Sequence, residues 1–488
     1  MRRLVLLLTL TACQQAPPST RPAPPAPTSR PTSMPLASAA VSPTPLPTGQ
    51  PSATPTPYPT PTPYPTPPTT PSPPGLPSAW PTNLQPQGPP PTPRPSLYPS
   101  IDCAHGLQIQ YQQADTPRWS SDSLRLAWSS MSVRLTYAGG AFCGERHGYA
   151  ASQIKVRSVR DGQTRDVLKD DTNQNLRLLS WHPVLPQLLF TIPVPIGGYS
   201  YPFTYQADAG QSSQLSTRVP VVNQNAVWSA DGLRLALQRP RTQTFAKSAV
   251  AVLTLATGEL KLPLSLELSQ DVRGIDWWPD QSGLLISLRN EPGQSSLQRL
   301  GLNGGLEVIW QPESRPEPQE ILSFRFSPDG KQLAWVLQRL ALNANQSGVY
   351  PQQMLYLADI SSAGVLTRVR SLVGLQRVGE AFAWSPDSHY LAVSEGTLQF
   401  QEPDSEDLFR VDTRTDSLLR LTNDAVGGNP VRNREPAWAP DNAHIAFSSN
   451  RQTRFDKWYA QPTDLFLIRP DGTGLEQLTQ TVYTDQLL

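Results

Sequence analysis

Residues 326–335 read FSPDGKQLAW and residues 384–393 read WSPDSHYLAV, and these two stretches decide the fold. In each, an aromatic residue precedes Ser-Pro-Asp, which favours a type I turn because proline fixes φ at the second turn position. An alternating apolar segment follows the turn, as expected of a strand that buries one face. Each stretch therefore predicts a β-hairpin.

The same pattern recurs along the chain. Close copies start at Trp228 and Trp438, and weaker copies start at Trp119, Trp181 and Trp277. With the two stretches above, they make seven anchors separated by 62, 47, 49, 49, 58 and 54 residues. A second hairpin follows each anchor, most clearly at residues 465–479, where LFLI precedes Asp-Gly and LEQLT. Four strands per period, repeated seven times, predict an all-β fold, namely a single seven-bladed β-propeller of four-stranded antiparallel blades over residues 100–488.

The pattern aromatic-Ser-Pro-Asp-Gly, Leu-Ala-Phe, Asp-Leu-Phe, Asp-Gly and Leu-Thr resembles the TolB-type, WD40-like β-propeller repeat over roughly residues 115–480. The resemblance implies that the repeated Trp, Pro, Asp and Gly residues are scaffold. Three copies depart from it: residues 181–184 (WHPV) lack the turn Asp, residues 119–122 (WSSD) lack the proline, and Trp278 replaces Ser. We expect residues 107–111, which alternate before the first anchor, to pair with the last blade and close the ring, which removes exposed sheet edges.

The N-terminus predicts export. Arg2 and Arg3 precede the short apolar run 4–10, which is too short to span a bilayer as a helix. Residues 10–13 read LTAC, which resembles the bacterial lipoprotein box and implies that Cys13 is acylated after removal of residues 1–12. The alternative is an ordinary cleaved signal with a free cysteine. The lipoprotein interpretation predicts a protein anchored to the cell envelope by the lipid on Cys13, facing periplasm or exterior.

Residues 13–99 predict a disordered, lipid-anchored Pro/Thr/Ser-rich spacer. Residues 14–99 contain 32 of the 55 prolines and no Asp, Glu or Lys, so this segment has few side chains to bury and lacks many backbone donors. The five arginines before residue 100 leave 35 basic against 39 acidic residues in 100–488, a net charge near −4. That mildly acidic balance does not resemble the basic stripe of a nucleic-acid-binding protein.

Two further cysteines, Cys103 and Cys143, are compatible with a disulfide because exported proteins meet oxidising conditions. The alternative is two unpaired cysteines buried as small apolar residues. Both interpretations stay open from the sequence.

Local catalytic motifs are absent from the sequence. The five histidines are scattered, and neither a His-Glu-x-x-His helix nor a Gly-x-Ser-x-Gly elbow occurs. Asp404, Glu406 and Asp407 form an acidic cluster that either binds calcium or simply stands on the surface between strands. No metal and no cofactor are predicted. The sequence therefore predicts a protein that is not an enzyme.

The predicted loops suggest a binding face. Turns built on Asp-Gly or Asn-Gly are short, whereas the loops between the second and third strand of several blades are long and aromatic. Aromatic and arginine side chains on a rigid scaffold are typical of recognition surfaces. The candidate ligand-binding residues are Tyr199, Tyr201, Arg454, Trp458 and Tyr459. The alternative is that these loops pack on one another and plug the channel.

These observations predict a non-catalytic extracytoplasmic lipoprotein that binds a protein, a peptide or an envelope glycan through its propeller, and that binds no nucleic acid. Two alternatives are an extracytoplasmic hydrolase or lyase with its site in the channel mouth, and a structural spacer-and-cap without a specific ligand. Acids and a histidine converging at the channel mouth would favour the enzyme.

Overall fold

The computed structural model describes residues 107–487 with gaps. The gaps are 139–143, 171–175, 194–198, 216–219, 222–225, 241–247, 268–269, 291–293, 314–316, 343–348, 373, 376, 397–404, 424–430, 452–461 and 482. The predicted signal, the spacer, Cys13, Cys103 and Cys143 lie outside the described residues. In the described part, no helix is long and apolar enough to cross a membrane.

The described chain forms β-strands that hydrogen-bond into six sheets. The first sheet has the order β29 (Tyr483–Leu487), β1 (Leu107–Trp119), β2 (Arg125–Ala138), β3 (Gly144–Ser158), β4 (Thr164–Asp170). The next two are four-stranded: β5 (Arg177–Trp181), β6 (Gln187–Pro193), β7 (Ser200–Gln206), β8 (Gln211–Gln214), and then β9 (Ala226–Trp228), β10 (Arg234–Arg239), β11 (Ala249–Thr254), β12 (Leu260–Ser265).

The fourth sheet has eight strands and consists of two antiparallel groups. They are β13 (Gln270–Trp277), β14 (Gly283–Asn290), β15 (Gln294–Gly301), β16 (Leu306–Trp310), and β17 (Gln319–Phe326), β18 (Gln332–Leu342), β19 (Val349–Ile360), β20 (Leu366–Ser371). A single parallel pair, Gln294 with Gln319, joins the groups. The last two sheets are four-stranded: β21 (Val378–Trp384), β22 (Tyr390–Gly396), β23 (Glu406–Asp412), β24 (Leu418–Arg420), and β25 (Asn433–Trp438), β26 (Ile445–Ser449), β27 (Asp464–Ile468), β28 (Glu476–Gln477).

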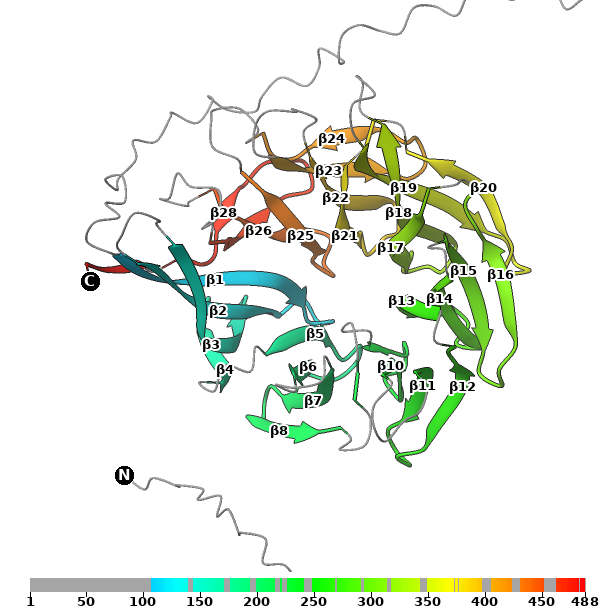
Figure 1. The fold of residues 1–488 in the computed structure, drawn as a ribbon, viewed down its shortest axis with the longest axis horizontal. Coiled ribbons are helices and arrows are strands. Elements are labelled where there is room, and N and C mark those ends of the chain that lie inside the picture. Colours follow the sequence, from blue (N-terminus) through cyan, green and yellow to red (C-terminus); the bar gives the residue numbers. More distant parts are fainter. Residues whose placement is uncertain are drawn as a thin grey trace, which may run out of the picture. The chain divides into compact units, whose positions relative to one another are not determined.

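Each anchor aromatic ends the first strand of an antiparallel four-stranded group, as the hairpin pattern predicts. Figure 1 shows these first strands, among them β1, β5, β13, β17, β21 and β25, gathered toward the centre, with later strands further out. Contacts between successive first strands, such as β21 with β25 and β25 with β1, agree with this arrangement. The chain is therefore all-β, with antiparallel sheets arranged as in a propeller.

Anchor tryptophans connect neighbouring groups by hydrogen bonds. The indole N–H of Trp181 donates to the Arg118 carbonyl at 2.9 Å, and that of Trp277 donates to the Val227 carbonyl at 3.0 Å. The indole N–H of Trp119, in the first group, donates to the Ala437 carbonyl in the last group at 3.1 Å. Residues distant in sequence thus meet through one recurring contact.

The first and the last of the described strands also pair. Residues 107–111 of β1 pair with β29, from Leu107 opposite Leu487 to Tyr111 opposite Tyr483. The expected partner was the last blade, whereas β29 lies in the first sheet, not with β25–β28. The Ala114 N–H adds a bond to the Thr463 carbonyl at 2.9 Å.

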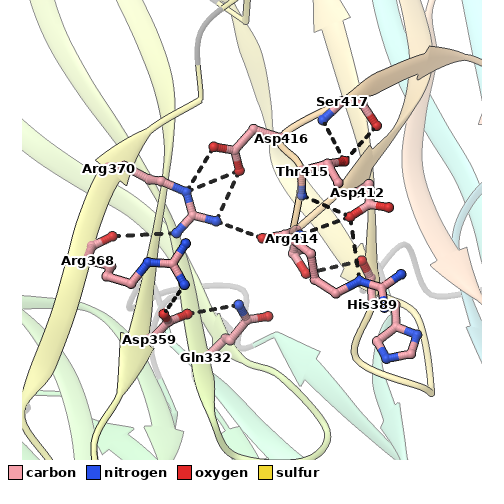
Figure 2. A network of polar contacts seen from close by, with 11 residues as sticks. Gln332, Asp359, Arg368, Arg370, His389, Asp412, Arg414, Thr415, Asp416 and Ser417 are labelled. Carbon is pink, nitrogen blue, oxygen red and sulfur yellow. Dashed lines mark hydrogen bonds and ion pairs between the residues drawn. The ribbon is translucent and has the colours of Figure 1, made fainter.

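A polar network joins the outer parts of two neighbouring groups (Figure 2). Arg370 on β20 donates to both carboxylate oxygens of Asp416, at 3.0–3.1 Å, and to the Thr413 carbonyl at 2.7 Å. Asp416 and Thr413 lie between β23 and β24. Because these donors and acceptors satisfy one another at the surface, the network connects the sheet that contains β20 to the sheet that contains β23 and β24.

The turn after Trp181 shows why one copy of the repeat can lack its aspartate. In typical copies the Asp carboxylate accepts the N–H two residues later, as Asp231 does from Leu233 at 2.9 Å. At residue 182 the imidazole takes that role, because His182 Nδ1 accepts the N–H groups of the two following non-proline residues at 3.0–3.1 Å. The proton then resides on Nε2, which lies 3.1 Å from the Gly232 carbonyl oxygen and donates to it.

The expectation of a long loop after the second strand is wrong for the first group. Strands β2 and β3 remain paired from Arg125 opposite Ser158 to Ala138 opposite Gly144. Tyr137 and Tyr149 therefore stand in an extended hairpin. Backbone pairing can continue past the sheet core wherever both strands are long enough, and composition alone does not show where pairing stops.

Candidate functional site

Two first strands carry a similar irregularity near the centre of the molecule. Strand β1 has a register shift between Asp115 and Arg118, and β25 has one between Arg434 and Ala437. Within these shifts, Thr116 and Glu435 both have a φ of +54°. Non-glycine residues rarely hold positive φ, and such strain concentrates at functional sites.

Glu435 is a half-buried carboxyl in an environment that disfavours its charge. Burial, together with the neighbouring Asp115 carboxyl, raises the pKa of Glu435. The Thr116 N–H and the Arg118 and Arg177 guanidinium groups act in the opposite direction but do not cancel the rise. Its Oε2 atom has no hydrogen-bond partner. An unpartnered carboxyl oxygen with a raised pKa is suited to exchange a proton with a bound molecule.

Asp115 provides a second carboxyl beside Glu435. Burial raises the pKa of Asp115, although the Thr463 hydroxyl donates to its Oδ1 at 2.6 Å and two arginines favour its charge. Enzymes likewise use the surroundings of neighbouring carboxyl groups to shift their pKa values away from the ordinary ones.

A pocket of about 420 Å³ opens beside Glu435. Its polar lining comes from β19, from β21 and the residue before it, from β22, from the start of β23 and from β25, and consists of Gln353, Arg377, Glu380, Ser394, Glu406, Arg434 and Glu435. Gly379, Ala381 and Gly396 also line it and leave the space that larger side chains would fill. The volume lies in the range of small-molecule sites.

Among the residues that line this pocket, two form an ion pair with each other, and one hydroxyl has no hydrogen-bond partner. Arg434 makes a two-pronged ion pair with Glu406, with Nε at 2.6 Å from Oε2 and Nη2 bonded to Oε1. Glu406 raises the pKa of Arg434, with smaller contributions from Glu435 and Asp115. Ser394 is only 1% exposed, and its hydroxyl has no hydrogen-bond partner. Two residues of the pocket lining, Glu435 and Ser394, thus carry a buried oxygen atom, Oε2 and Oγ respectively, without a hydrogen-bond partner.

The predicted ligand residues lie elsewhere or outside the described chain. Tyr199 and Tyr201 are half-buried and contact each other edge to face, with ring centroids 6.0 Å apart. They do not line the Glu435 pocket. Arg454, Trp458 and Tyr459 fall in the gap 452–461. A binding role for these five residues remains a prediction.

The predicted acidic cluster separates in space. Asp407 is buried and accepts hydrogen bonds from Arg420 and from the Thr422 hydroxyl, the latter at 2.8 Å, whereas Glu406 turns to Arg434. Asp404 lies outside the described residues. Among the described residues, no group of three His, Cys, Asp or Glu side chains is arranged to hold a metal ion.

Sequence reasoning missed Asp115, Arg118, Arg434 and Glu435. A signal was present, because DTPRW and REPAW both place charges and a proline directly before an anchor tryptophan. The repeat makes this strand the innermost one of each group, so charges on it lie closer to the centre than charges on the later strands (Figure 1).

No family model matches the chain, and no curated protein matches it. Solved structures similar to it include the β-propeller domain of the trilobed protease from Pyrococcus furiosus, with 13% identity, TM-score 0.49, 76% of this chain covered and 98% of the other. An oligogalacturonate lyase from Vibrio parahaemolyticus has 10% identity and TM-score 0.48, with 73% and 90% covered. TolB from Acinetobacter baumannii has 14% identity and TM-score 0.36, with 67% and 75% covered. At these values the likeness concerns the fold.

These comparisons correct one prediction. The chain was expected to be a non-catalytic binding or scaffold protein and not an enzyme, because no local catalytic motif occurs. That expectation is contradicted, since the similar structures include oligogalacturonate lyases and peptidases. The prediction relied on the absence of a contiguous motif, and a catalytic site assembled from several sheets would need none.

Proposed function

We propose that this protein is a hydrolase or a lyase whose catalytic site is the Glu435 pocket. The observation that carries the proposal is Glu435 itself, a residue of the pocket lining whose carboxyl has a raised pKa and a buried oxygen without a hydrogen-bond partner. No described histidine joins the acids there, so the proton chemistry falls to carboxyl groups.

The two reaction classes use Glu435 in opposite protonation states. In a hydrolase, the protonated carboxyl gives its proton to the leaving group while a water molecule attacks the atom from which that group departs. In a lyase, the carboxylate takes a proton from carbon, and the leaving group departs as a double bond forms. A pKa raised toward the working pH serves both roles because both states are then accessible. Burial, and after it like-charge repulsion from Asp115, keeps the pKa of Glu435 raised, so Asp115 acts through Glu435 in this scheme.

The test is a turnover assay with the full chain on glycan and peptide polymers, following chain cleavage together with the ultraviolet absorbance of a new conjugated double bond. Cleavage with that absorbance identifies a lyase, and cleavage without it a hydrolase. The activity must fall by about 100-fold or more in Glu435→Gln. An activity that persists in this variant would overturn the assignment of the site.

We also infer that the sheets make one seven-bladed ring, with the eight-stranded sheet counted as two blades. The support is that the contacts recurring between neighbouring groups also join the last group to the first, through Trp119 with Ala437 and through Ala114 with Thr463.

Ring closure predicts a difference between two tryptophan variants. Trp119→Phe removes the bond to Ala437 and should lower the free energy of unfolding by about 1 kcal/mol more than Trp228→Phe. Trp228 is the matched control because its indole N–H has no partner. Urea unfolding of both variants measures the difference, and equal losses would argue against the closed ring.

We propose further that the protein is exported and held at the cell envelope by lipid on Cys13, with residues 14–99 as spacer. The support is the sequence LTAC at 10–13 after a charged and apolar leader. Cys13→Ala should move the protein from the membrane fraction to the soluble fraction, whereas Cys103→Ala should not. Wild-type protein that takes up no labelled fatty acid would contradict the anchor.

A further inference from the structure

Three arginines on first strands make no ion pair within the described chain, although Arg118 and Arg177 interact electrostatically with Glu435, and Arg325 does so with Asp276. Arg118 donates to the carbonyls of Leu179 at 3.2 Å and Pro117 at 2.9 Å, and Arg325 donates to the Phe324 carbonyl at 2.9 Å. Arg177 makes no side-chain hydrogen bond. Among the described residues, no carboxylate lies within ion-pair distance of any of the three.

Other arginines on the first strands are neutralised. Arg273 on β13 pairs with Asp271 at 3.2 Å and with Glu320 at 2.8 Å, and Arg434 pairs with Glu406. The unpaired state of the three is therefore not a general property of this part of the fold.

The fold places two of these arginines at one level. Arg118 and Arg325 each directly precede an anchor aromatic, on β1 and β17, and a tryptophan of the following group donates to the carbonyl of each, at 2.9 Å and 3.1 Å. The same position in three other first strands holds a small residue, namely Ser180, Ala383 or Ala437. The Ser180 hydroxyl is buried without a partner. The two remaining first strands hold Val227 and Asp276 there, and Asp276 interacts electrostatically with Arg325. Two guanidinium groups thus share a level with small side chains, one carboxyl and an unsatisfied hydroxyl.

The arginines interact electrostatically with Glu435 and with one another. Arg118 and Arg177 both interact electrostatically with Glu435, and Arg118 also interacts with Arg325, whose like charge adds to burial in lowering the pKa of Arg118. The acids that face the cluster are Asp115 on β1, Asp276 on β13 and Glu435 on β25, and burial raises the pKa of each. A bound anion would supply the counter-charge that these acids provide only at a distance.

We propose that the substrate carries an acidic group, a carboxylate or a phosphate, and that Arg118, Arg177 and Arg325 hold this group beside Glu435. The inference rests on the proposed function, because it names the substrate class of the same site. The arginines would fix the acidic group so that the bond to be broken lies at Glu435.

The test measures binding to the full chain by calorimetry with three probes: a hexuronic acid oligosaccharide, its neutral methyl ester, and inorganic phosphate. We expect the oligosaccharide or phosphate to bind and the methyl ester not to bind. Which probe binds distinguishes a carboxylate from a phosphate site. Arg177→Gln and Arg325→Gln should each weaken binding about 10- to 100-fold. Arg177→Lys, which keeps the charge, should retain more affinity than Arg177→Gln.

Arg414→Gln is the control, because Arg414 is 60% exposed on the turn after β23 and far from the cluster in the fold. Absence of binding by both anionic probes, equal binding of the methyl ester, or unchanged affinity in both Gln variants would overturn the inference. Glu435→Gln separates the two proposals. If it binds the anion but has lost turnover, both stand; if turnover on a neutral substrate depends on Glu435 while no anion binds, only the inference fails.

Discussion

Glu435→Gln is expected to reduce turnover by about 10²- to 10⁴-fold, the range typical for loss of a general acid or base. Glutamine keeps the shape of the side chain and can still accept the Thr116 N–H, but it cannot exchange a proton. A steady-state assay of kcat and KM measures the effect, which should fall mainly on kcat. Glu307→Gln, on the exposed outer strand β16, is the matched control.

The same substitution should not destabilise the protein at neutral pH. The pKa of Glu435 is raised in the folded state above the ordinary value of glutamate, so folding favours its protonated form. Stability contributed by that protonated form is present below the ordinary glutamate pKa and declines as pH rises through the raised value. Thermal unfolding at about pH 8 should therefore show Glu435→Gln to be at least as stable as wild type, with any advantage vanishing near pH 4. An inactive variant that is also clearly less stable at about pH 8 would point to a structural role instead.

Gly232→Ala is expected to lower the free energy of unfolding by about 3 kcal/mol or more, whereas Gly258→Ala should cost about 1 kcal/mol. Both glycines lie in turns with φ near +70°, so the backbone strain of an added Cβ is nearly the same. At Gly232 the new Cβ would lie 2.1 Å from Cε1 of His182, whereas at Gly258 nothing lies within 4 Å. Urea unfolding of the two variants isolates the contact.

Moving His182 away from the new Cβ would cost free energy, because the residue is only 5% exposed and its two ring nitrogens form hydrogen bonds with residues 184, 185 and 232. His182→Ala should therefore be destabilising by itself but should lessen the additional cost of Gly232→Ala, which a double-mutant cycle measures. If Gly232→Ala and Gly258→Ala lose equal stability, the clash with His182 is unimportant.

Sequence determined the local architecture because its determinants are local. The stretch FSPDGKQLAW contains its own turn residues and its own alternation, so the hairpin at 326–335 follows without knowledge of the rest of the chain. The spacing of the anchors then predicted antiparallel four-stranded groups, and the structure contains them. The sequence showed that the copy at residues 181–184 lacks the turn aspartate. It did not show that the imidazole of His182 replaces that aspartate, because the two N–H groups reach the ring only in the folded turn.

The proposed site depends on tertiary structure alone. Asp115 and Glu435 are 320 positions apart in the chain, and neither belongs to a motif with catalytic spacing. They meet because β1 and β25 come together where the last group reaches the first, and burial there raises the pKa of both carboxyls. Arg118 and Arg325, which make no ion pair with the described residues, interact electrostatically for the same reason, since equivalent positions of separate repeats share a level around the centre. A single sequence shows which residues repeat, but the pKa of a carboxyl and the pairing of an arginine depend on neighbours that only the folded chain supplies.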